Sequence, residues 1–173
     1  MNIRDFKSTS ITLVKTEVDF DRLKLLFLEF ASSIDFDLCY QSFIQELSNI
    51  HEQYSPPNGI AFILSQDNNT IGCVGLRKAI PGVAIVKRLY IRSDFKRPHF
   101  GKQLLKVAID WANQTGMKKL RLDPSDTVHG ISKICVDEGF SEIYPGNIPT
   151  ASSLACFEMK LSPKPEFSRL MAS

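Results

Sequence analysis

The chain has 173 residues, of which 43% are hydrophobic, and its formal net charge is +2. This length suits one domain with one core, and the hydrophobic share is too high for a disordered protein. A charge so close to neutral gives no general attraction to nucleic acid, so we expect no nucleic-acid partner. Residues 1–5 lack the apolar core of a signal peptide, and no apolar run is long enough to span a membrane. We therefore expect a cytoplasmic protein with no membrane partner.

The cysteines and histidines are too scattered to indicate a metal site or a disulfide framework. No two cysteines form a C-x-x-C pair, and the chain has only three histidines. We expect no bound metal and a reducing compartment. The cysteines are Cys39, Cys73, Cys135 and Cys156.

The first third of the chain predicts a tail, a strand and two helices. Residues 1–10 have the character of a tail, and residues 11–16 that of a short strand. Asp19 is predicted to cap a helix, because apolar residues recur after it at helical spacing. A second amphipathic helix is predicted over 38–54, and the Pro- and Gly-containing residues 55–59 end it.

The rest of the chain alternates strands with helices. The predicted strands are 60–65, 71–76, 83–91, 117–122, 140–144 and 153–161, with a hairpin turn at Asp67-Asn68-Asn69. The predicted helices are 100–115, which Gly116 ends, and 127–138, which Gly139 ends. The prolines after residue 161 indicate a second tail, 162–173.

The order of these elements is β-α-α-β-β-β-α-β-α-β-β. Strand–helix–strand units favour parallel neighbours around 83–91 and 117–122, whereas the consecutive hairpins before them favour antiparallel strands. We therefore predict an α/β domain over 11–161, with a mixed sheet and helices on both faces.

The turn from Lys96 to Lys102 has the features of a phosphate site. It leads from a strand into a helix, whose first N–H groups are unpaired and lie at the positive end of the helix dipole. Basic residues crowd this part of the chain: Lys87, Arg88, Arg92, Lys96, Arg97 and Lys102. A solvated basic face is the alternative interpretation of that cluster.

This stretch resembles the GNAT N-acetyltransferase superfamily. Residues 87–95 resemble its central strand, the turn after them its pyrophosphate loop (Arg/Gln-x-x-Gly-x-Gly/Ala), and residues 135–140 its Tyr-x-x-x-Gly-Phe segment. The resemblance covers about residues 11–161 and implies a mostly antiparallel twisted sheet and acetyl-CoA as co-substrate. It also implies cofactor contacts from the strand and the loop, namely Leu89, Tyr90, Ile91, Lys96, Arg97, His99, Phe100, Gly101 and Lys102. Core packing is a second role for the three strand residues.

The loop departs from the family pattern at several positions. Lys96 replaces Arg or Gln, Arg97 and His99 stand where glycines are common, and Pro98 has no N–H to donate. Gly101 is retained. We expect weaker cofactor binding than is usual, or a loop of adjusted shape, in which His99 either crowds the phosphate or contacts it.

The catalytic positions depart as well. Ile85 occupies the place of the Glu that removes the proton from the acceptor amine, and Cys135 that of the Tyr that protonates the departing thiolate. Cys135 is a candidate general acid or a small core residue. His51, His99 and His129 are further candidates for the base, but neither His99 nor His129 has a spacing that places it at an amine. Glu142 and Tyr144, on the strand after Gly139, either approach the substrate side or lie exposed on the surface.

Two functions follow from this sequence, with an unrelated α/β domain as a third alternative. The first is an N-acetyltransferase that moves acetyl from acetyl-CoA to a primary amine of a small molecule or peptide. The second is a catalytically weak or inactive acyl-CoA-binding module. Residues 36–54 and 144–153 are expected to shape the acceptor site, where Asp35, Asp37 and Glu46 either attract a cationic amine or cap helices. A homodimer is common in the family.

Overall fold

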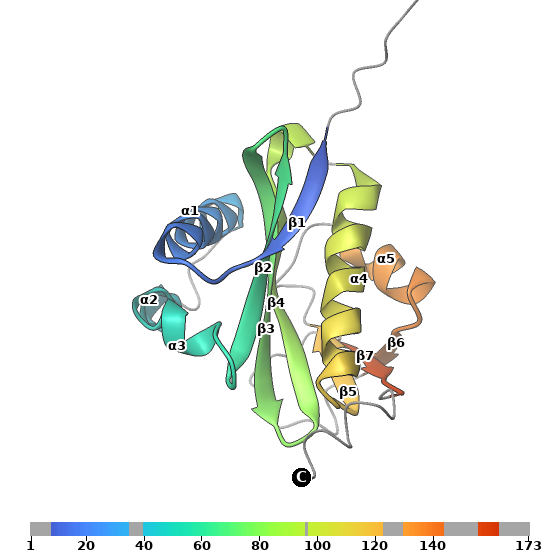
Figure 1. Ribbon diagram of the computed structural model, residues 1–173. Helices are drawn as coiled ribbons and strands as arrows, with labels where there is room; N and C mark the ends of the chain where they lie inside the picture. The colour runs from blue at the N-terminus through green and yellow to red at the C-terminus, as the bar shows by residue number, and fades with distance from the viewer. Residues whose placement is uncertain (1–7, 35–39, 96, 123–129, 144–155, 163–173) are drawn as a thin grey trace, which may run out of the picture.

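The computed structural model describes residues 8–34, 40–95, 97–122, 130–143 and 156–162. These residues form a seven-stranded sheet of order β1-β2-β3-β4-β5-β7-β6 (Figure 1). Every neighbouring pair is antiparallel except β4 and β5, which are parallel, as predicted. The strands are β1 (Thr9–Leu13), β2 (Gly59–Gln66), β3 (Asn69–Ile80), β4 (Val83–Ile91), β5 (Lys119–Leu122), β6 (Ser141–Ile143) and β7 (Cys156–Lys160). The predicted mixed α/β fold is confirmed.

Helices cover both faces of the sheet. On one face lie α1 (Glu17–Ser33), α2 (Tyr40–Ser48) and α3 (Ile50–Gln53); on the other lie α4 (Pro98–Gln114) and α5 (Ile131–Asp137) (Figure 1). Each face has its own apolar core. The core under α4 and α5 includes Val86, Leu89 and Leu104, and the core under α1 includes Phe27 and Tyr90. No helix in the described ranges is long and apolar enough to cross a membrane.

Several boundaries differ from the predicted ones for local reasons. The cap of α1 is Thr16, not Asp19: its hydroxyl accepts from the Asp19 amide at 3.2 Å, and the Asp19 carboxylate accepts from the Thr16 amide in return. The predicted helix 38–54 is two helices, because Asn49 leaves helical geometry at φ −111° and ψ 25°. The first strand starts at Thr9, inside the predicted tail, and it ends at Leu13.

The β2–β3 hairpin is tight, as its sequence predicts. Asp67 and Asn68 both have positive φ, 49° and 65°, the conformation of a two-residue hairpin turn that matches the strand twist. The hairpin makes β2 and β3 antiparallel neighbours.

A bulge interrupts β4 at Arg88. Between two matched pairs, Gly75 with Lys87 and Cys73 with Tyr90, β4 advances by one residue more than β3 does. Simple alternation would place Arg88 on the α4 face with Val86, but the extra residue sends its side chain to the α1–α3 face, against Glu46 of α2. The alternation resumes with Leu89 on the α4 side and Tyr90 on the α1 side.

Candidate functional site

The edge of β4 that faces β5 is paired over only part of its length. The parallel ladder joins Val83–Val86 to Lys119–Leu122, and no described residue of β5 pairs with β4 beyond Val86. The backbone from Lys87 to Ile91 therefore presents amide and carbonyl groups on that side, which suit the amide-containing arm of a cofactor. The side chains of Leu89 and Ile91 are buried under α4 and that of Tyr90 under α1, so these residues also pack the cores.

The phosphate-loop segment is more helical than predicted. α4 begins at Pro98, two residues before the predicted start at Phe100. Of the described residues in the predicted loop from Lys96 to Lys102, only Arg97 lies before the helix. Arg97 is the N-cap and makes no side-chain capping hydrogen bond, although its carbonyl accepts from the Phe100 amide at 3.1 Å. The side chains of Arg97 and His99 are exposed, whereas Phe100 is buried. Lys96 lies outside the described residues.

The end of this segment contacts α5. Gly101 is buried in α4, and a Cβ built on it would lie 3.5 Å from Ile134 Cδ1 of α5, an ordinary contact distance. Lys102, a predicted phosphate ligand, places its Nζ 3.2 Å from Glu138 Oε1. That ion pair links α4 to the residue after α5 and uses part of the charge expected to face a phosphate.

A buried ion pair lies on the other side of the bulge. Arg88 Nη2 donates to Glu46 Oε2 at 2.6 Å and Arg88 Nε donates to Glu46 Oε1 at 3.3 Å. Tyr54 donates its hydroxyl to Glu46 Oε1 at 2.5 Å. The rings of Phe30 and Phe43 lie against the guanidinium, at 5.4 and 5.2 Å from its central carbon. Both charged side chains are nearly fully buried.

The pairing keeps Glu46 charged. Burial alone would raise the pKa of this carboxyl, but the hydrogen bonds and positive charge of Arg88 outweigh burial and hold the pKa below its ordinary value. Glu46 is therefore committed to Arg88 and Tyr54, and the expectation that it attracts a cationic amine is wrong. Asp35 and Asp37 lie outside the described residues. The helical spacing of Glu46 with buried Phe43 and Ile50 was the signal in the sequence for its burial.

Ile85 lies in the middle of a charged row on the α1–α3 face of the sheet. Its register partners are Arg77 on β3 and Arg121 on β5. Arg121 pairs with Glu158 on β7, its Nε 2.8 Å from Glu158 Oε2, and Lys119 Nζ lies 3.0 Å from the other oxygen. Burial acts to raise the pKa of Glu158, but these two cations outweigh it and the pKa is lowered. Glu158 is thus a paired carboxylate and a weak proton acceptor.

Cys135 is enclosed in the core beneath α4. Its side chain has no exposed surface, and burial raises its pKa to about 12. A thiol in that position packs like a small apolar residue. The placement favours the packing role over the acid role, which stays a prediction.

The other titratable candidates are dispersed. His51 stacks on Phe20 at 4.0 Å between ring centroids, and its Nε2 lies 3.4 Å from a Glu17 carboxylate oxygen. Glu142 is exposed on β6. His129 and Tyr144 lie outside the described residues. Within the described ranges, no group of three or more metal-binding side chains comes together.

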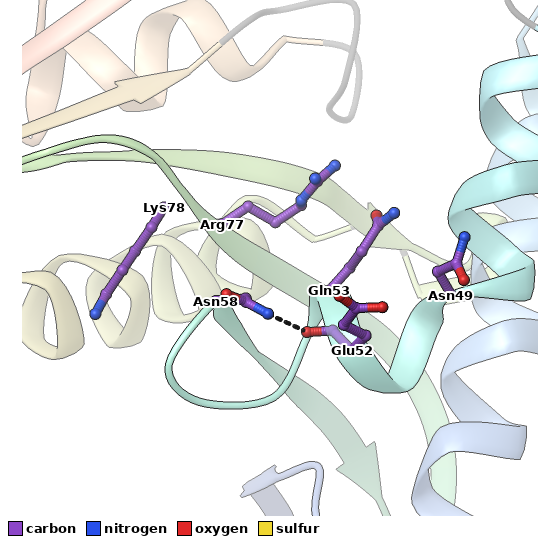
Figure 2. Close-up of a pocket in the computed structure, with 6 residues that line it drawn as sticks. All are labelled: Asn49, Glu52, Gln53, Asn58, Arg77 and Lys78. Atoms are coloured by element: carbon purple, nitrogen blue, oxygen red, sulfur yellow. Dashed lines mark hydrogen bonds between the residues drawn. The ribbon is translucent and has the colours of Figure 1, made fainter.

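A polar cavity opens beside the α1–α3 face of the sheet, between α3 and β3 (Figure 2). Its volume is about 410 Å³, within the range of small-molecule pockets. Arg77 and Gln53 extend their polar ends to the same side of β3, and Lys78 points away from them (Figure 2). The lining residues are Asn49, Glu52, Gln53, Asn58, Arg77 and Lys78.

Comparison with known proteins identifies the family of this chain. The sequence model of the Acetyltransferase (GNAT) family matches residues 23–130, which include the bulge in β4 and the start of α4. The chain belongs to the GNAT acetyltransferase family. An uncharacterised N-acetyltransferase of Schizosaccharomyces pombe is 31% identical over 138 residues, 79% of this chain and 85% of that protein.

Solved GNAT structures have the same fold. A GNAT-family acetyltransferase of Staphylococcus aureus Mu50 aligns with a TM-score of 0.75 at 17% identity, over 90% of this chain and 100% of its own. The PaiA N-acetyltransferase of Thermoplasma acidophilum, solved in complex with coenzyme A, aligns with a TM-score of 0.64 at 22% identity, over 88% of this chain and 99% of its own.

Proposed function

We propose that this GNAT protein transfers an acetyl group from acetyl-CoA directly to a primary amine of a small molecule or peptide. The carrying observation is the edge of β4 beyond Val86, with which no described residue of β5 pairs, next to the start of α4. In this proposal the backbone of Leu89, Tyr90 and Ile91 holds the pantetheine arm. The pyrophosphate is held by the backbone amides of His99, Phe100 and Gly101 and by the basic side chains of Lys96, Arg97 and Lys102.

The proposed chemistry depends on orientation more than on a dedicated base. Ile85 cannot accept a proton, and Glu158 and Glu46 are each paired with arginine. Holding the deprotonated fraction of an amine against the thioester can itself supply a large part of the acceleration. The rate should therefore rise with pH as more of the amine loses its proton.

Ile85 and the enclosed Cys135 favour a second candidate, an acyl-CoA-binding module with little or no turnover. The two candidates share the cofactor and differ in whether thiol is released. The cytoplasmic location and the homodimer both stay predictions; sedimentation of the purified protein tests the latter.

Thiol release from acetyl-CoA across a panel of amines, with the acetylated product confirmed by mass spectrometry, tests the proposal. We expect release above background, and a KM for acetyl-CoA at least about tenfold higher in His99→Glu, which places a negative charge beside the phosphates. The matched control is Lys106→Gln, which changes an exposed residue further along α4. Its KM for acetyl-CoA should equal that of the wild type.

Isothermal titration calorimetry separates the two candidates. Heat from acetyl-CoA binding without thiol release would establish the binding module. No heat at millimolar acetyl-CoA would contradict both.

A further inference from the structure

In the charged row across the α1–α3 face, Arg77 has no ion-pair partner among the described residues. Arg121 and Lys119 share Glu158, and Arg88 has Glu46. Arg77 is half-buried, and within the described ranges no carboxylate forms an ion pair with its guanidinium. A partly buried guanidinium without an anion is a ready site for a carboxylate, which matches its planar pair of donors.

A second polar group, whose hydrogen bond is missing among the described residues, lines the same cavity. The Oε1 atom of Gln53 is buried and has no hydrogen-bond partner among the described residues. Buried polar atoms are nearly always hydrogen-bonded, so an orphaned acceptor in a cavity wall indicates a donor that arrives with a ligand. Gln53 and Arg77 direct their polar ends to the same side of β3 (Figure 2).

The cavity adjoins the place where the reaction is proposed to occur. Arg77 is the register partner of Ile85, so their Cα atoms lie about 5 Å apart. Ile85 immediately precedes Val86, the last residue of β4 that pairs with β5. On the α1–α3 face, Arg77 therefore lies one strand away from the point where the pairing of β4 with β5 ends.

The charge of the cavity discriminates between classes of amine. Arg77 contributes one positive charge to the lining, and the exposed Glu52 contributes one negative charge. A polyamine offers no anion to Arg77, whereas an amine that also carries a carboxylate offers one.

We infer that the acceptor is an amine bearing a carboxylate, as in an amino acid or short peptide, that Arg77 binds this carboxylate, and that the Gln53 side-chain oxygen accepts from an N–H of the same molecule. This inference rests on the proposed acetyl transfer and narrows its substrate class. Arg77 is a specificity residue in it and takes no part in proton transfer.

Matched acceptors test the inference. Free amino acids and dipeptides are compared with their carboxamides, which keep the shape and lose the charge. We expect kcat/KM to favour the free acids by about tenfold or more, the size of one charge-assisted hydrogen bond. The amine of a carboxamide is the less basic of the two, so it is deprotonated more often, and this bias works against the expected result.

Variants of Arg77 show whether the preference comes from this site. Arg77→Gln should abolish it by lowering kcat/KM for the acids alone, and Arg77→Lys should retain part of it. Lys106→Gln, on the opposite face of the sheet, should leave it intact. Equal rates for acids and amides in wild type, or a preference that survives Arg77→Gln, would overturn the inference while leaving acetyl transfer established.

A binding measurement decides the case in which no amine is acetylated, an outcome that contradicts the proposed function. The Nε–H signal of Arg77 is followed by NMR during titration with sodium acetate, with Arg77→Gln used to assign the signal. A saturable shift supports the carboxylate site independently of turnover. An unmoved signal overturns it.

Discussion

Arg88 has a left-handed backbone, φ 52°, that residues other than glycine seldom adopt. Such a conformation costs on the order of 1–3 kcal/mol and persists only where the surroundings fix it. Here Glu46 holds the side chain, and the Cys73 thiol donates to the Arg88 carbonyl at 3.4 Å. These contacts hold the bulge beside the unpaired edge of β4.

Removing the charge of Glu46 should therefore destabilise the fold. We expect Glu46→Gln to lower the free energy of unfolding by about 3 kcal/mol or more, because it leaves Arg88 buried without its counter-charge. The control is Glu29→Gln, which breaks the half-exposed Glu29–Arg92 pair and should cost about 1 kcal/mol or less. Urea denaturation measures both, and equal costs would show that burial does not distinguish the two pairs.

At the scale of elements, the start of α4 combines features that favour the binding of a phosphate with features that oppose it. Its N-terminal amides favour an anion, yet Pro98 provides no N–H, and the exposed His99 stands where the family pattern has its first glycine. Gly101 stands where that pattern has Gly or Ala, and among the described residues a Cβ there meets Ile134 alone.

These two positions should respond differently to substitution. We expect His99→Gly to tighten acetyl-CoA binding several-fold, since it removes a side chain from the phosphate approach, at a helix-propensity cost of a few tenths of a kcal/mol. Gly101→Ala should raise stability by about 0.5–1 kcal/mol and leave affinity unchanged. Calorimetry and thermal denaturation check both; weaker binding in His99→Gly would mean that the imidazole contacts the phosphate.

Over the whole molecule, the sequence predicted the order of elements and the parallel β4–β5 pair, because apolar periodicity and turn residues are local signals. It could not predict the bulge, because the run from Val83 to Ile91 contains no glycine or proline to mark one. The Glu46–Arg88 pair depends on that bulge and joins residues 42 apart in the chain, so it was missed too. The sequence singled out Cys135 by its place in the family pattern. Its burial depends on packing with α4 and β5, which are distant in the chain.

Acid should weaken the fold through its paired carboxylates. The pKa values of Asp19, Glu46 and Glu158 are lowered in the folded protein, so below their unfolded values of about 4 the unfolded chain binds more protons. We expect an unfolding free energy nearly constant from pH 7 to about 5 that falls as the pH drops through these folded pKa values. Urea denaturation across this range tests it, and Glu46→Gln should reduce the slope.

Among the described residues, each of the two cores contains one enclosed thiol, Cys73 beneath α1 and Cys135 beneath α4. Burial raises the pKa of both, so a thiolate reagent can reach either one only when its side of the sheet opens. Timed alkylation, with each cysteine quantified by peptide mass, would therefore report local opening on each face separately, without an introduced label. Equal rates would show that the two layers come apart in one cooperative event, and unequal rates would show which layer loosens first.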